Sequence, residues 1–290
     1  MLWLTLSLLS AFSQATADAF TKRVVKDADT YMVAWLRNMA AVPFLVVALF
    51  FIPMPKLDST FYWAVGLSLP LEVVASLLYV KALEVSPISL TMPFQALTPL
   101  YLLATSFFML GEVPSPAGAA GVCLLGVGAY LLNAHALKKN GIFAPFKAIY
   151  REKGSMMMMG VAAIYALTSD LGKLAIIHSS PVFFGSVYVI IFSFFLGPFA
   201  FFLSRKKRPV ETFMGSPRTF VFIGLIITAL VITQTLALNL TQVSYMIAVK
   251  RTSLLFSIGY GWWMFREENI RERLVGGSVM LAGLVLMVLG

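Results

Sequence analysis

Residues 82–89 read ALEVSPIS and residues 237–244 read ALNLTQVS, and the two stretches match at an offset of 155 residues. The same offset takes Glu112 to Glu267, Gly121 to Gly276 and Gly128 to Gly283. An offset of 152 takes the triplet Thr16-Ala17-Asp18 to Thr168-Ser169-Asp170. Several matches in one register, acidic residues among them, indicate an internal duplication.

The chain around these matches is apolar enough for a membrane. Hydrophobic residues make up 59% of the 290 positions and charged residues only 12%. A spanning helix needs about 20 mostly apolar residues. Ten segments qualify, and they are too long and too continuously apolar for barrel strands: Leu2–Phe20, Tyr31–Ile52, Phe61–Ala82, Ser89–Leu110, Ala117–Leu137, Ser155–Ile177, Pro181–Ser204, Thr219–Leu240, Gln242–Phe265 and Leu274–Leu289.

We therefore expect an all-α membrane protein of two five-helix repeats. The first repeat covers residues 1–137, a basic linker covers 138–154, and the second repeat covers 155–290. Five is an odd number, so the two repeats enter the membrane from opposite sides, which predicts inverted repeats around a central cavity. Within the linker, residues 143–151 form either a short amphipathic helix on the lipid surface or a plain basic connection.

Basic residues are distributed unequally among the predicted links. The odd-numbered links hold seventeen Lys and Arg residues, whereas the even-numbered links hold only Lys56. Cytoplasmic loops carry the excess of positive charge. This explains the pI near 9.7 without a nucleic-acid partner. It predicts a multi-pass inner-membrane protein with the odd links in the cytoplasm and both termini outside it.

The sequence lacks the patterns of an enzyme or a metalloprotein. It has two histidines, one cysteine, no Cys/His ligand cluster, no phosphate-binding loop and no dinucleotide fingerprint. We expect no catalytic residues, no metal and no cofactor. The expected partners are a small-molecule or lipid anion and the surrounding lipids, and the expected oligomeric state is a monomer or a homodimer.

Two copies of one motif carry a family resemblance. Residues 109–118 read MLGEVPSPAG and residues 264–277 read MFREENIRERLVGG; each leads from a span through a Glu to a Gly-rich helix. The chain resembles the EamA-type, ten-helix branch of the drug/metabolite transporter superfamily. The resemblance implies two pseudo-symmetric five-helix bundles, a central cavity, and secondary transport of metabolites or export of drugs and amino acids. EamA-type proteins usually keep both termini in the cytoplasm, and the charge distribution here predicts the reverse.

Lys250 and Arg251 lie near the middle of the ninth segment. The pair is similar to the Lys-Arg pair that plastid phosphate translocators place in their ninth helix, which implies a grip on a substrate phosphate. Charge at that depth is costly and usually functional. Neighbouring residues are about 100° apart on a helix, so both can border one cavity as an anion clamp. The alternative is that their side chains reach to an interface.

The other candidate site residues are polar groups inside predicted spans. Asp18 and Asp170 recur in the repeat, and Lys173 lies one turn after Asp170, a spacing that allows an ion pair. These residues form a gate, or couple transport to protons, or only lie at helix ends without a role in transport. Either Arg37 and Glu72 pair with each other, or Arg37 joins the anion site. Gln14, Gln95 and Gln234 either line the cavity or hydrogen-bond between helices.

Together these features predict a secondary transporter that moves a small organic anion, phosphorylated anions included, by alternating access. The predicted substrate-binding residues are Lys250, Arg251, Arg37, Gln95, Gln14 and Gln234. The predicted coupling or gate residues are Asp18, Asp170, Lys173 and Glu72. Two alternatives remain open, a proton-driven exporter of amino acids or drugs and a flippase for an anionic lipid headgroup.

Overall fold

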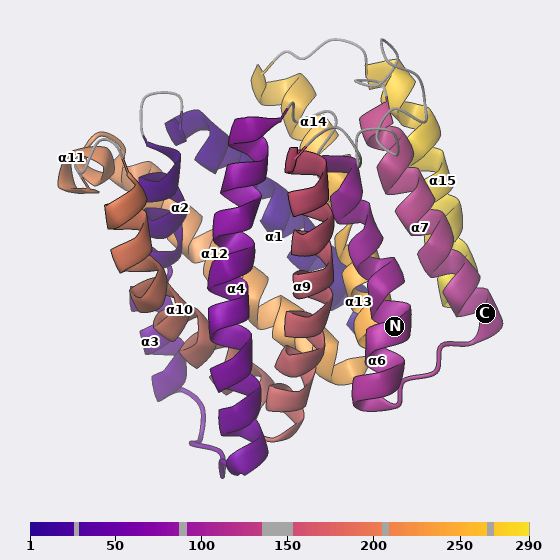
Figure 1. Cartoon of the computed structure of the whole chain (residues 1–290), viewed down its shortest axis with the longest axis horizontal. Helices are drawn as coiled ribbons and strands as arrows, with labels where there is room; N and C mark the ends of the chain where they lie inside the picture. Colours follow the sequence, from indigo (N-terminus) through magenta and orange to yellow (C-terminus); the bar gives the residue numbers. More distant parts are fainter. Residues whose placement is uncertain (26–28, 87–91, 135–152, 205–208, 266–269, 290) are drawn as a thin grey trace.

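The computed structural model of the chain describes residues 1–25, 29–86, 92–134, 153–204, 209–265 and 270–289. In these ranges it contains helices and no β-strand (Figure 1). The elements in chain order are α1 (Leu2–Val25), α2 (Thr30–Met39), α3 (Val42–Phe50), α4 (Ser59–Val85), η1 (Met92–Leu97), α6 (Thr98–Leu110), α7 (Pro116–Ala134), α9 (Lys153–Ile177), α10 (Pro181–Leu203), α11 (Pro209–Met214), α12 (Pro217–Leu240), α13 (Val243–Lys250), α14 (Ser253–Phe265) and α15 (Ile270–Leu289). The linker segment 143–151 lies outside the described residues.

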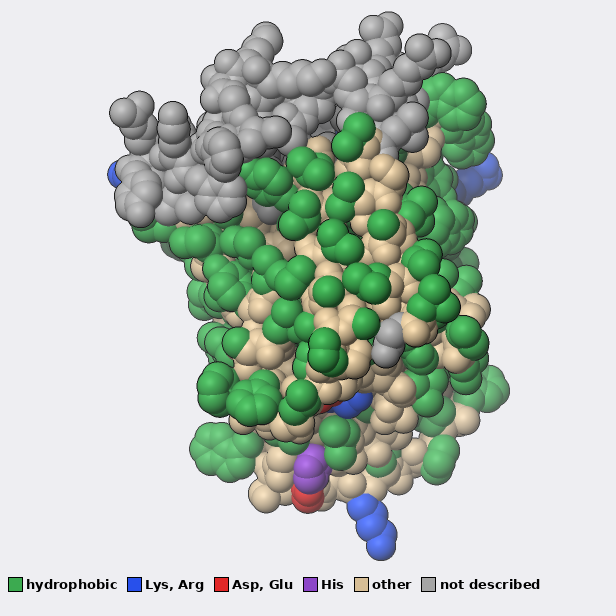
Figure 2. All heavy atoms as spheres, turned by 90° about the vertical axis from the view of Figure 1, so that its right-hand side faces the viewer, with side chains coloured by type: hydrophobic (Ala, Val, Ile, Leu, Met, Phe, Trp, Pro, Cys, Tyr) green, Lys and Arg blue, Asp and Glu red, His purple; other side chains and the backbone are tan. Residues whose placement is uncertain are grey.

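Each of the ten predicted segments contains helix in its described residues, and length and composition qualify some of them as membrane spans. Among the described residues, five stretches are long and apolar enough to cross a membrane: Tyr31–Phe50, Ser59–Ala82, Lys153–Ile177, Pro181–Leu203 and Pro217–Leu240. Phe94–Leu110, Pro116–Leu131 and Val275–Leu289 are shorter apolar helices. Apolar side chains are spread over the face of the bundle that Figure 2 shows, and Phe50, Phe108 and Phe202 are each more than 80% exposed. Such a surface suits lipid and not water.

Two predicted spans are interrupted at equivalent positions of the repeat. In the fourth segment the 3₁₀ helix η1 gives way to α6 at Thr98, and in the ninth α14 begins at Ser253, exactly one 155-residue offset later. Tight hydrogen bonds carry the chain through the second break, where the Thr252 N–H donates to the Val249 carbonyl at 2.9 Å. Irregular backbone at membrane depth is tolerated where protein or a cavity surrounds it. The second break places Lys250 and Arg251 at a helix end inside the bundle.

The ends of one pair of equivalent helices follow the same offset as the sequence matches. Helix α4 ends at Val85 and α12 at Leu240, which are 155 residues apart. Packing follows the correspondence too, since α1 packs on α12 and α9 packs on α4. This contact of one repeat with the other therefore has a counterpart.

Helices α7 and α15 pack closely through their glycines. A Cβ atom added at Gly121 would lie 2.7 Å from the Gly283 carbonyl oxygen, and one added at Gly128 would lie 2.8 Å from that of Gly276. Position 121 thus faces 283 while 128 faces 276, so the two helices run antiparallel. Small residues of this kind let two backbones approach closely in a membrane.

We expect Gly121→Leu and Gly128→Leu to destabilise the protein by about 1–3 kcal/mol each, because an overpacked helix contact must separate. Gly66→Leu is the matched control, since a Cβ there meets nothing within 4 Å. Thermal unfolding in detergent measures the difference. Equal unfolding temperatures for all three variants would contradict the close packing of α7 and α15.

The links define two ends of the molecule. The even-link end carries the connections at residues 51–58, 111–115, 178–180 and 241–242, in the lower part of Figure 1. The odd-link end is opposite and holds the end of α1 and the start of α2. Trp3, near the start of α1, lies 6.4 Å from Tyr245 in ring-centroid distance, and Tyr245 contacts Ser115. The start of the described chain therefore lies at the even-link end.

Candidate functional site

A cavity of about 400 Å³ penetrates the bundle from the odd-link end. Helices α1, α2, α4, α9, α10 and α12 contribute its lining. The cavity begins beside Thr21 and Tyr31 at the helix ends and reaches Glu72, midway along α4. Three predicted site residues line it: Gln14, Arg37 and Glu72. Its volume is within the range of about 300–1,000 Å³ that is usual for small-molecule sites.

Arg37 is held against α1 by Asp18. The Arg37 Nη1 donates to the Asp18 Oδ1 at 3.1 Å, and the Gln14 Nε2 donates to the other carboxylate oxygen at 2.8 Å. The expected alternative, an ion pair between Arg37 and Glu72, is not formed. The Asp18 side chain is 46% exposed and that of Arg37 22%. Asp18 thus fixes the Arg37 guanidinium at the cavity, and the other N–H groups of Arg37 remain for a ligand.

Lys250 and Arg251 are not among the residues that line the cavity, and they lie near its inner part. The Lys250 Nζ donates to the Gln234 Oε1 at 2.5 Å, and Gln234 is one turn of α12 beyond the cavity-lining residues Leu230 and Val231. Arg251 lies within electrostatic range of Tyr79 and Tyr165, which line the cavity. Among the described residues, no carboxylate oxygen lies within 4.0 Å of either cation, and the Arg251 Nε has no hydrogen-bond partner there.

Several cavity residues escaped prediction from the sequence. Ser76 and Tyr79 follow Glu72 at spacings of four and seven, so α4 turns one polar stripe toward the cavity. This helical periodicity was readable in the sequence. Tyr165 on α9 and Asn38 on α2 had no such signal, because each is a single polar residue among apolar ones.

Gln95 lies away from this cavity. It is half-buried in η1, which packs on α7 and α9, and it does not line the described hollow. Gln95 is nevertheless the repeat counterpart of Lys250, so the two halves differ in charge at this position. The Lys-Arg pair belongs to the second repeat alone.

Asp170 and Lys173 do not pair with each other, although their spacing allows it. Asp170 is fully buried and accepts a hydrogen bond from the Ser106 Oγ at 2.5 Å. Lys173 points elsewhere, donating to the main-chain carbonyls of Leu238 and Thr241. Asp18 and Asp170, which are equivalent in sequence, therefore have opposite environments. Asp18 is exposed beside the cavity-lining Gln14 and Arg37, and Asp170 is sealed in the bundle.

Comparison with known proteins adds the family. The model of the EamA-like transporter family matches residues 1–134 and again residues 152–289, which together span nearly the whole chain. The chain belongs to the EamA-like transporter family. It is accordingly a multi-pass membrane protein and a membrane transporter of the drug/metabolite type. A comparison with curated proteins gives no significant match.

The fold of this EamA-like transporter is also found in solved structures. One solved structure, titled "Crystal structure of protein", superposes with a TM-score of 0.76 over 99% of this chain and 97% of the other. The two sequences are 13% identical, so the similarity concerns the fold alone.

At its even-link end the transporter is closed by contacts between the two repeats. The Lys173 Nζ lies 3.9 Å from the Glu112 Oε1, and the Glu112 Oε2 accepts the Val243 N–H at 2.8 Å. Lys173 thus caps the last carbonyls of α12, and Glu112 caps the start of α13. Burial raises the pKa of the Glu112 carboxyl, while the Val243 N–H and Lys173 oppose that rise.

Further contacts close the same end. The His178 Nδ1 lies 2.6 Å from the Asp58 Oδ2, which joins the link before α10 to the start of α4. The Asp58 carboxylate also accepts the Phe61 N–H at 3.0 Å, and this bond, with His178, lowers the pKa of Asp58. The Tyr245 hydroxyl accepts the Ser115 N–H at 3.2 Å. The cavity therefore has access from one end only in this conformation.

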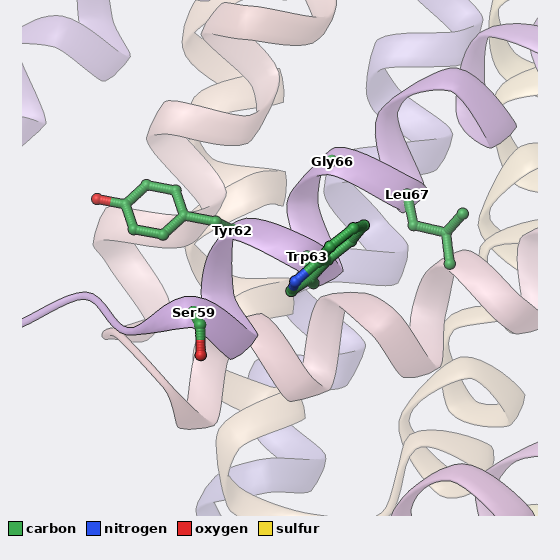
Figure 3. A pocket seen from close by; sticks show the side chains of 5 residues that line it. All are labelled: Ser59, Tyr62, Trp63, Gly66 and Leu67. Carbon is green, nitrogen blue, oxygen red and sulfur yellow. The ribbon is translucent and has the colours of Figure 1, made fainter.

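A second hollow, on the outer face of α4, is not a comparable site. It is lined by Ser59, Tyr62, Trp63, Gly66 and Leu67, which follow one another along a single helix (Figure 3). Tyr62 and Trp63 are 62% and 79% exposed. Aromatic side chains near a span end are typical of the membrane–water interface. The same holds for the exposed Trp262 and Trp263 of α14, at the other end. Tyr260 of α14 differs from them, because its hydroxyl lies 2.7 Å from the Thr16 Oγ1.

Proposed function

We propose that this protein is a secondary transporter for a small organic anion, phosphorylated anions included. One observation carries the proposal: Arg37 lines a cavity at membrane depth, and the cations Lys250 and Arg251 lie near its inner part. Among the described residues only Arg37 has a carboxylate within 4.0 Å. Neighbouring cations repel each other and resist desolvation, and a bound phosphate or carboxylate relieves both costs. Arginine adds a planar fork that matches either group.

We further propose that transport proceeds by alternating access of two inverted repeats. The antiparallel contact of α7 with α15 supports this, because Gly121 facing Gly283 becomes Gly276 facing Gly128 when the repeats are exchanged. A two-fold axis in the membrane plane produces such an exchange. If the repeats swap conformations, Asp170 becomes exposed, Asp18 becomes buried, and the cavity opens at the even-link end.

A transport assay tests the proposed substrate class. Purified protein in liposomes should exchange internal for external phosphorylated or carboxylated anions, measured with radiolabelled substrate. We expect exchange of at least one such anion and none of neutral analogues. If the protein exchanges no anion and instead transports amino acids or cationic drugs driven by a proton gradient, the proposal is overturned in favour of a proton-driven exporter.

We propose that the protein lies in the inner membrane with the odd-link end in the cytoplasm and both termini outside. The unequal loop charges support this orientation. In it, the cavity described above faces the cytoplasm.

Single cysteines at the two ends test the orientation. Arg218 at the odd-link end and Lys56 at the even-link end are both exposed basic residues. In a Cys123→Ala background, Lys56→Cys should react with a membrane-impermeant maleimide in intact cells, and Arg218→Cys should react only after lysis. The reverse labelling pattern would show the opposite orientation.

A further inference from the structure

The cavity wall is divided by chemistry. Helix α1 contributes only the polar Gln14 and Thr21, and α4 contributes the polar Glu72, Ser76 and Tyr79 together with the apolar Leu77 and Val80. Helices α10 and α12 contribute apolar side chains without exception: Val189, Phe192, Leu196, Ala200, Ile227, Leu230 and Val231. A fully hydrophilic anion would leave this wall facing water or a polar ligand.

From this geometry we infer that the substrate is an anion that carries a hydrocarbon chain. Its charged group lies with Arg37, Lys250 and Arg251, and its chain lies along the apolar wall of α10 and α12. The inference rests on the proposed anion transport and specifies its substrate class. The chain gains from leaving water, since each buried methylene contributes about 0.8 kcal/mol, or about fourfold in affinity.

The test is a chain-length series of monoalkyl phosphates, from ethyl to octyl phosphate. Binding to the purified transporter in nanodiscs is measured by calorimetry, with empty nanodiscs subtracted. If only three of the six additional methylenes reach the wall, octyl phosphate should bind about sixtyfold more tightly than ethyl phosphate. A lysophosphatidic acid placed in the nanodisc then identifies the source. If lysophosphatidic acid displaces octyl phosphate, the natural ligand comes from the membrane. If it does not displace octyl phosphate, the natural ligand comes from water. Either result retains an anion that carries a hydrocarbon chain.

Variants locate the chain. Val189→Thr and Val231→Thr add a hydroxyl to the apolar wall, so each should reduce the octyl-to-ethyl affinity ratio severalfold. Val74→Thr is the matched control, because Val74 is 46% exposed on α4 and does not line the cavity. Unfolding temperatures verify that each variant is folded.

Two results are decisive against the inference. Equal affinity for ethyl and octyl phosphate would overturn the hydrocarbon chain and leave anion transport intact. Failure of every anion to bind, ethyl phosphate included, would overturn the proposed function itself.

Discussion

Replacing Lys250 or Arg251 by Gln is expected to lower anion exchange in liposomes by about ten- to hundredfold. The loss corresponds to a charge-assisted hydrogen bond of about 1.5–3 kcal/mol. Lys250 keeps a neutral partner, Gln234, at 2.5 Å, so a Gln at position 250 can still be accommodated beside α12. Folding should be retained, because removing an intramembrane charge removes a desolvation penalty.

Arg251→Lys provides the finer measurement. It keeps the charge and loses the planar fork, so binding should weaken by less than in Arg251→Gln. Lys56→Gln is the control for charge removal, since Lys56 is exposed at the even-link end. Normal exchange by both Lys250→Gln and Arg251→Gln would exclude the anion site, and the proton-driven exporter would then be favoured.

The largest expected effect on stability belongs to Lys173→Met. The methionine matches the length of lysine and donates no hydrogen bond, so the carbonyls of Leu238 and Thr241 and the Glu112 carboxylate all lose a partner. The Lys173 and Glu112 side chains are only 11% and 13% exposed. Breaking a buried charge pair on one side costs about 3–5 kcal/mol. The unfolding temperature in detergent should fall accordingly.

A double variant separates the charge effect from the loss of packing. Lys173→Met with Glu112→Gln removes the uncompensated charge, and the Gln carbonyl can still accept the Val243 N–H. It should therefore recover part of the lost stability. If Lys173→Met alone costs less than about 1 kcal/mol, the cluster does not hold the even-link end closed.

Some site residues were predictable because a local pattern carries them. The cationic pair stands out in a span by charge alone, and Asp18 and Asp170 recur at the repeat offset. The polar stripe Glu72, Ser76 and Tyr79 was also legible as helix periodicity. The partner of each charge was not predictable from the sequence. Sequence spacing offered Asp170 for Lys173, and the structure uses Glu112, which is 61 positions away and reaches Lys173 only through interhelical packing.

The sequence by itself determined the helical class and the duplication. These follow from apolar segment length and from recurrence in register. Only the tertiary structure decided which helices pack through their glycines and which end is open. The duplication gives the two ends equivalent places in the repeat, so the choice between them depends on the sum of weak contacts between the repeats. Arg37 therefore binds Asp18 at the open end while Asp170 stays buried with Ser106, although the sequence gives both aspartates the same place in the repeat.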